Sequence, residues 1–167
     1  MDEHTIYRFN VKKLNGEEIS LSRYTNKVLL IVNTASECGF APQLQDLEEL
    51  RKAFEGTDFE ILAFPSNDFG GQEPLDDSGL ASFCEINHGA NYQTFAKIRV
   101  RGTYANPLYK FLADKKLNGN IKSTPKWNFH KYLINRKGEV VDFFYPFTKP
   151  NSSKIKKKIA RLLSSKN

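Results

Sequence analysis

Cysteine and histidine are scarce in this sequence. Its 167 residues include two cysteines, Cys38 and Cys84, and three histidines, which are dispersed without the spacing of metal ligands. A disulfide framework is therefore not indicated, and no metal site is expected. Two thiols, whether reactive or inert, suit a reducing compartment, so a cytoplasmic location is expected.

Long hydrophobic runs and shifts in composition are also missing. The first five residues have neither the basic nor the apolar segment of a secretory leader. No apolar run approaches the roughly 18 residues that a membrane helix needs, so stable membrane insertion is not expected. Without a repeat, linker or low-complexity tract, the chain is expected to form one domain, residues 1–167.

Positive charge is in moderate excess, with 25 Lys and Arg against 19 Asp and Glu and a net charge of +6. Much of the excess falls in the last twenty residues. Four apolar residues lie among these cations at helical spacing, namely Ile155, Ile159, Leu162 and Leu163. The pattern favours an amphipathic terminal helix with solvated lysines over a surface that binds nucleic acid or a membrane.

Cys38 occupies a position that favours a reactive thiol. Residues 28–32 are a wholly apolar run, typical of a strand that is buried on both faces. From Pro42 the apolar residues recur at helical spacing and predict a helix over 42–55. Cys38 therefore falls between a strand end and a helix start, where free N–H groups and the helix dipole stabilise a thiolate. The alternative is that Cys38 is a small buried apolar side chain.

The helix alone falls short of what a reactive thiolate requires. Lowering the pKa of a cysteine by about 1.5 units takes about 2 kcal/mol. A helix end supplies up to about 2 kcal/mol, and only in a favourable, partly buried geometry. Additional hydrogen-bond donors are therefore expected from elsewhere in the chain.

The remaining pattern predicts an α/β chain. A second apolar strand at 59–64 follows the 42–55 helix, so the two strands form a right-handed βαβ unit with their carboxyl ends on the same side. Other expected elements are strands at 7–11, 19–21, 129–134 and 140–144, an extended segment at 92–98, and helices at 78–87, at 106–116 and at the C-terminus. This is the order of a thioredoxin-like fold, with a central mixed β-sheet flanked by helices and an N-terminal β-hairpin turning at Asn15-Gly16.

The loop at 65–74 follows the second strand and contains Gln72. It lacks the Lys and Ser/Thr of a phosphate-binding loop, so its paired glycines are weak evidence for a nucleotide. Because the loop leaves the same side of the sheet as Cys38, Gln72 is a candidate donor to the sulfur. The alternative is a solvated loop glutamine.

Three stretches of the chain resemble the glutathione peroxidase family of the cysteine type, over essentially its whole length. They are NTASECGF at 33–40, FPSNDFGGQEP at 64–74 and KWNF at 126–129. The resemblance implies that Cys38 is the peroxidatic residue and that Gln72, Trp127 and Asn128 surround its sulfur. It also implies that no cofactor is bound.

The implied residues suit the chemistry. The indole N–H of Trp127 and the amides of Gln72 and Asn128 can all donate hydrogen bonds to an anionic sulfur without adding charge. The alternatives are that Trp127 is a core residue and that Asn128 forms a turn. The expected reaction is attack of the Cys38 thiolate on hydrogen peroxide or on an organic or lipid hydroperoxide, which leaves a sulfenic acid on Cys38.

Cys84 resembles the resolving cysteine of the thioredoxin-dependent members of the family. A disulfide requires two Cα atoms within about 7 Å, so the 78–87 helix is expected to unwind during turnover. Ala41 replaces the second cysteine of a Cys-x-x-Cys pair, which argues against a dithiol oxidoreductase. The resemblance implies a monomer that takes electrons from thioredoxin, with glutathione as the second candidate. A buried, inert Cys84 is the alternative.

Some positions depart from the usual family pattern. Glu37 stands where lysine is frequent, Ser66 where many relatives have a further cysteine, and Asp68 where glutamine is usual. An acid beside Cys38 raises its pKa slightly and repels the carboxylates of glutathione. A redox sensor or relay that passes a disulfide to a partner would need the same residues as the peroxidase. His130 is expected to point outward from its strand, because side chains alternate there.

Overall fold

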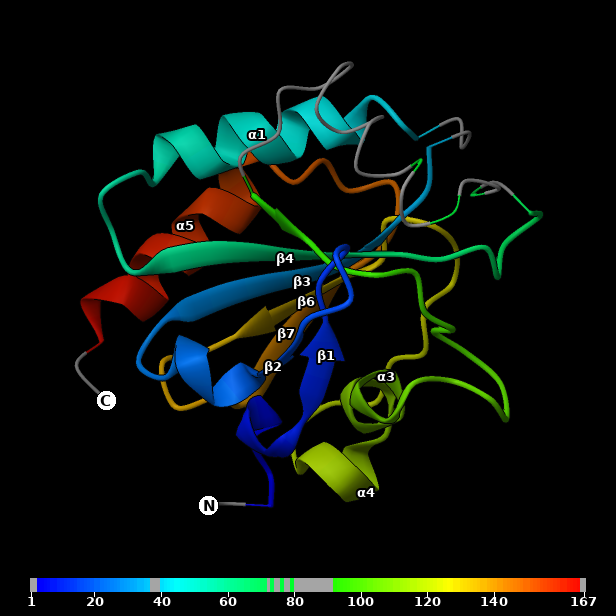
Figure 1. Ribbon diagram of the computed structural model, residues 1–167. Helices are drawn as coiled ribbons and strands as arrows, with labels where there is room; N and C mark the ends of the chain where they lie inside the picture. Colours follow the sequence, from blue (N-terminus) through cyan, green and yellow to red (C-terminus); the bar gives the residue numbers. More distant parts are fainter. Residues whose placement is uncertain are drawn as a thin grey trace.

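The computed structural model describes residues 3–36, 40–71, 73, 76, 79 and 92–165 (Figure 1). Cys38, Gln72 and Cys84 lie outside these residues, as does almost all of the expected 78–87 helix. The described 3-10 turns are η1 (Ile6–Arg8) and η2 (Leu21–Tyr24), and the helices are α1 (Gln43–Ala53), α3 (Pro107–Ala113), α4 (Lys115–Asn118) and α5 (Ser153–Ser164). The strands are β1 (Asn10–Lys12), β2 (Glu18–Ser20), β3 (Val28–Thr34), β4 (Phe59–Pro65), β5 (Gln93–Thr94), β6 (Lys131–Ile134) and β7 (Val140–Phe144).

The larger sheet is mixed, with the strand order β5-β4-β3-β6-β7. β3 pairs in parallel with β4 through the α1 crossover, as the βαβ pattern predicts. β6 pairs antiparallel with both β3 and β7. The five-stranded mixed sheet and the separate β1-β2 hairpin confirm the thioredoxin-like fold class.

Helices cover both faces of this sheet, so β3 is buried along its whole length. Leu29 and Ile31 pack into one apolar cluster with the hairpin and α3. Leu30 and Val32 point the other way, into a second cluster with α1 and α5. Figure 1 shows α1 and α5 on one side of the sheet and α3 and α4 on the other.

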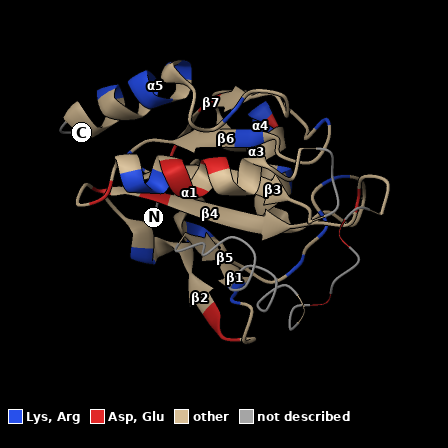
Figure 2. Cartoon of the chain, turned by 90° about the horizontal axis from the view of Figure 1, so that it is seen from above, with Lys and Arg blue, Asp and Glu red and all other residues tan. Residues whose placement is uncertain are grey.

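The C-terminal helix is amphipathic, as predicted. Ile155 and Ile159 are fully buried against the sheet, whereas Lys154 and Lys157 are exposed. Figure 2 shows the basic residues spaced along α5.

Several expected elements differ in extent, among them the strand expected at 129–134, which begins at Lys131. The helix expected at 106–116 ends at Ala113, because Asp114 is extended and its carboxylate accepts a hydrogen bond from the Lys116 N–H, which caps the short α4. The strand expected at 7–11 is shorter, because residues 6–8 form η1 and β1 begins only at Asn10. The strand expected at 19–21 lies one residue earlier, because η2 begins at Leu21.

Candidate active site

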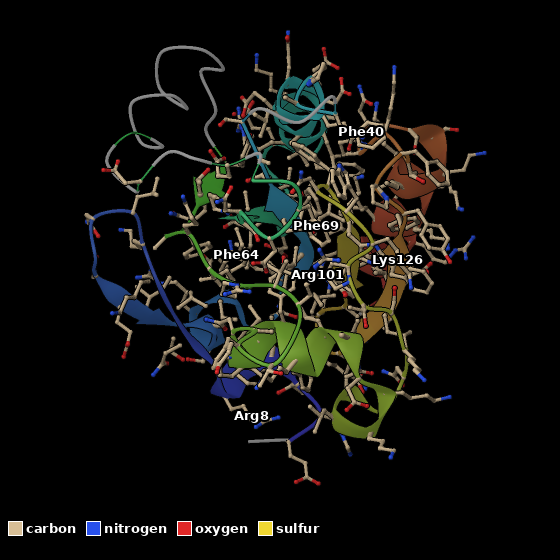
Figure 3. All side chains as sticks on the ribbon, turned by 90° about the vertical axis from the view of Figure 1, so that its right-hand side faces the viewer. Arg8, Phe40, Phe64, Phe69, Arg101 and Lys126 are labelled. Carbon is tan, nitrogen blue, oxygen red and sulfur yellow. The ribbon has the colours of Figure 1, made fainter. Side chains whose placement is uncertain are left out.

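Three segments that are far apart in the sequence meet at one edge of the sheet. Thr34, the last residue of β3, pairs with Pro65, the last residue of β4, so the segments that continue to Cys38 and Gln72 leave the same edge. Val32 pairs with Lys131, the first residue of β6, so the turn with Trp127 and Asn128 arrives there too. Figure 3 faces this edge, with Phe69 and Lys126 among the labelled residues.

A buried carboxylate joins the first two segments. Glu73 is 1% exposed, and its oxygens accept hydrogen bonds from the Ser36 N–H at 2.9 Å and the Ser36 hydroxyl at 2.6 Å. The Glu73 N–H donates to Asn67 Oδ1 at 2.9 Å, and Lys97 donates to the Glu73 carbonyl at 2.8 Å. These hydrogen bonds therefore join the loop after β3 to the loop after β4. In the sequence, the joined residues lie two positions before Cys38 and one position after Gln72.

The third segment is held against the end of β3. Asn33 Nδ2 donates to the Trp127 carbonyl at 3.1 Å, and the Phe129 N–H donates to the Asn33 carbonyl at 2.6 Å. Phe129 has φ of +69°, a left-handed conformation that costs a non-glycine residue about 1–3 kcal/mol. Asn128 is completely buried and Trp127 is half-buried. The sheet edge thus brings Trp127 and Asn128 to the strand that leads to Cys38.

Aromatic packing links the Trp127 turn to the loop after β4. The rings of Trp127 and Phe69 lie 5.3 Å apart between centroids. The guanidinium carbon of Arg101 lies 4.2 Å from the centroid of the Phe69 ring, a cation–π contact (Figure 3). A positive charge therefore stands next to the aromatic pair.

Asp68 fixes this arrangement, which the sequence did not indicate. Its carboxylate is 5% exposed and accepts hydrogen bonds from the Val100 N–H at 2.7 Å and from Arg99 Nε at 2.6 Å. Arg101 donates to Asp68 through its N–H and to the Asp68 carbonyl through Nη2. In the sequence, Asp68 stood out as an acid within a loop rich in turn-forming residues, at a position where glutamine is usual in the family pattern.

His130 does not point outward, so that expectation is wrong. It is completely buried, and its Nε2 lies 2.9 Å from the Ser123 hydroxyl. His130 directly precedes β6, an inner strand whose four residues are all buried because the sheet is covered on both faces. Burial, with a smaller effect from Lys131 and Lys126, lowers the pKa of His130 to about 4 and keeps the imidazole neutral at pH 7.

Lys131 is a second feature that the sequence analysis missed. Its side chain is completely buried, and Nζ donates to the Phe129 carbonyl at 2.7 Å. Burial lowers the pKa of Lys131 to about 7, against an opposing effect of Asp46. The signal was a lysine at the start of an otherwise apolar strand.

The described part of the chain holds neither a cluster of metal ligands nor a membrane-spanning helix. No group of three or more His, Cys, Asp or Glu side chains there could hold a metal ion. Among the same residues, no helix combines the length and the apolar character needed to cross a bilayer.

Comparisons with known proteins agree with these observations. A family model described as glutathione peroxidase matches residues 6–113. A glutathione peroxidase from Lactococcus lactis is 43% identical over 94% of this chain and 98% of its own length. A glutathione peroxidase-like peroxiredoxin 2 from Saccharomyces cerevisiae is 40% identical over 96% of this chain and 98% of its own length. The crystal structure of T. cruzi GPX1 has a TM-score of 0.76 at 32% identity and covers 98% of this chain and 99% of that chain. The chain therefore belongs to the glutathione peroxidase family and is a thiol peroxidase, an oxidoreductase that reduces hydroperoxides with electrons from a thiol.

Proposed function

We propose that Cys38 is the peroxidatic residue of this peroxidase. Its thiolate attacks the terminal oxygen of a hydroperoxide, the O–O bond breaks, and the leaving oxygen takes up a proton to depart as water or an alcohol. Cys38 is oxidised to a sulfenic acid as the hydroperoxide is reduced. The observation that carries the proposal is the meeting of the segments around Cys38, Gln72 and Trp127 at one sheet edge.

Uncharged donors stabilise the sulfur in this proposal. Gln72, Trp127 and Asn128 each offer an N–H group, and none of them introduces a charge that a buried site would have to neutralise. The Glu73–Ser36 hydrogen bonds support the approach of Gln72 to Cys38, because they join the two loops next to these residues. The Asn33–Trp127 hydrogen bond supports the approach of the third donor.

Cys84 resolves the sulfenic acid in the second step. The Cys84 thiol attacks Cys38 sulfur, water leaves, and a Cys38–Cys84 disulfide forms. Thioredoxin is the proposed reductant, because a dithiol reductant can reduce the Cys38–Cys84 disulfide by thiol–disulfide exchange. Glutathione is the second candidate, and the acidic Glu37 beside Cys38 disfavours its carboxylates.

The whole chain, residues 1–167, is the proposed catalytic unit, acting as a monomer without a bound cofactor. The apolar clusters that join the hairpin, the sheet and α5 support a single domain. A reducing compartment such as the cytoplasm suits this cycle, because both thiols must return to the reduced state.

A map of the disulfides after treatment with one equivalent of hydrogen peroxide tests the mechanism. Tryptic peptides of the alkylated protein, analysed by mass spectrometry, should contain a Cys38–Cys84 disulfide. The Cys38→Ser protein serves as the control and should leave Cys84 alkylated. An unmodified Cys38 after peroxide has been consumed would exclude its proposed role. A Cys38 sulfenic acid without a disulfide would exclude Cys84 as the resolving residue.

A further inference from the structure

Lys131 forms three hydrogen bonds to backbone carbonyls in the interior. Its Nζ donates to the carbonyls of Phe129 at 2.7 Å, Pro146 at 3.2 Å and Tyr145 at 3.5 Å. No carboxylate of the described residues forms an ion pair with it. The side chain thus bridges the turn after Trp127 and the segment that follows β7.

A second side chain, from the helix that follows Cys38 in the sequence, donates to one of these three carbonyls, that of Pro146. Gln43, the first residue of α1, donates through Nε2 to the Pro146 carbonyl at 2.7 Å, and Gln43 is 4% exposed. The Pro146 carbonyl therefore accepts hydrogen bonds from both Gln43 and Lys131. Because Lys131 also donates to the Phe129 carbonyl, the start of α1 is connected to Phe129 through Pro146 and Lys131. We call the set formed by Lys131, Gln43 and the carbonyls of Phe129, Tyr145 and Pro146 the carbonyl clasp.

Stability does not account for a lysine at this position. Placing an ammonium in the interior carries a desolvation penalty that hydrogen bonds offset only in part. A methionine of similar length would fill the same space without that penalty. The hydrogen bond from Lys131 fixes the orientation of the Phe129 carbonyl. Phe129 has a left-handed backbone conformation, which is unfavourable for a non-glycine residue and must be held by its surroundings.

We propose that Lys131 is a positioning residue for peroxide reduction. Through the carbonyl clasp it holds the turn at 127–129 in the conformation that directs Trp127 and Asn128 toward the sulfur of Cys38. This inference rests on the proposed function of those two residues. In this role Lys131 acts on the reaction through the turn at 127–129.

Trp127 gives the proposal a direct readout, because it is the only tryptophan in the chain. In the Lys131→Met protein, the Trp127 emission maximum should shift and acrylamide quenching should increase. The second-order rate constant with hydrogen peroxide should fall roughly ten- to a hundredfold, since small displacements of catalytic groups have effects of this size. The Lys131→Arg protein keeps N–H donors at this position, so it should retain more of the rate than Lys131→Met.

Leu133→Ala is the matched control. Leu133 is buried in the same strand, two residues from Lys131, and does not take part in the carbonyl clasp. This protein should unfold at a lower temperature while the emission and quenching of Trp127 stay unchanged. If Leu133→Ala alters Trp127 as strongly as Lys131→Met does, Lys131 has only a structural role and the inference is wrong.

The Trp127→Phe protein separates this inference from the proposed function. Loss of rate in Trp127→Phe, together with unchanged emission and rate in Lys131→Met, would overturn the role of Lys131 alone. Full activity of Trp127→Phe would overturn the proposed role of Trp127. Should Lys131→Met not fold, Lys131→Gln keeps one amide donor and is subject to the same measurements, and unchanged emission and rate there also overturn the inference.

Discussion

The carboxylate of Glu73 accepts hydrogen bonds from both the N–H and the hydroxyl of Ser36, at 2.9 and 2.6 Å. The two residues lie 37 positions apart in the sequence, on the loops that follow β3 and β4. Ser36 is two residues from Cys38, and Glu73 is the neighbour of Gln72. This pair joins the two loops next to the proposed catalytic residues.

Glu73→Gln should weaken this connection. Hydrogen bonds to a charged acceptor contribute about 1.5–3 kcal/mol, and the amide can accept only through its single oxygen. We expect a free energy of unfolding lower by about 1–3 kcal/mol and a slower reaction with peroxide, measured by urea unfolding and by stopped-flow kinetics. Ser36→Ala is the companion variant. A double-mutant cycle without coupling between the two changes would contradict the stated role of the pair.

Cys84→Ser should separate oxidation from recycling. The first equivalent of hydrogen peroxide should still oxidise Cys38 at the wild-type rate, because Cys84 acts only afterwards. Steady-state consumption of NADPH, coupled through thioredoxin reductase and thioredoxin, should fall to background. Full thioredoxin-dependent turnover in this protein would exclude a resolving role for Cys84.

His130 should make stability depend on pH between about 4 and 6.5. The ordinary pKa of histidine is 6.5, and burial lowers the pKa of His130 to about 4 in the folded protein. In that interval the unfolded chain binds a proton that the folded chain does not, so stability decreases as pH falls. The contribution of neutral His130 to the free energy of unfolding is fully present above pH 6.5. At pH 4 the free energy of unfolding is lower by about 3 kcal/mol.

Urea unfolding of the wild type and of His130→Gln from pH 4 to 7.5 measures this effect. Carboxylates also titrate at the acidic end, so the informative quantity is the difference between the two proteins. The decrease in stability below pH 6.5 should be smaller in His130→Gln. Parallel curves would show that His130 does not titrate in the way that its burial indicates.

A comparison of alanine substitutions at Gly138 and Gly16 separates the effect of steric contact on stability from the effect of backbone conformation. Both have positive φ, +81° and +89°, which disfavours any residue with a Cβ. A Cβ at Gly138 would also come within 2.6 Å of the Tyr7 ring, whereas a Cβ at Gly16 meets nothing within 4 Å. Gly16→Ala should cost about 1 kcal/mol, and Gly138→Ala about 1–3 kcal/mol more. Thermal unfolding of both proteins gives the comparison, and equal losses would argue against the contact with Tyr7.

Local patterns correctly predicted several elements. The apolar run at 28–32 lies within β3, which is buried on both faces. Asn15-Gly16 does join two paired strands, and the spacing of Ile155 and Ile159 does define the buried face of α5. Each of these features depends on neighbours in the sequence, through hydrophobic periodicity and turn preferences.

The position of His130 shows where such patterns fail. Alternation along a strand predicts an outward side chain only if one face of the sheet meets solvent. His130 directly precedes β6, which lies between β3 and β7 and is covered on both faces. This coverage depends on the packing of segments far away in the chain. Glu73, Asp68 and Lys131 were missed for the same reason, because their partners are distant or are backbone groups.

The sequence by itself determined the order of strands and helices, since this follows from local periodicity. It also provides the prediction that Cys38 reacts and that Gln72, Trp127 and Asn128 donate to its sulfur, which rests on residue type and on the family resemblance. Only the tertiary structure decided how the loops are held together. The behaviour of a buried carboxylate, lysine or imidazole depends on the groups around it. A charged or polar group that is removed from water needs a few specific partners, and only the tertiary structure provides them.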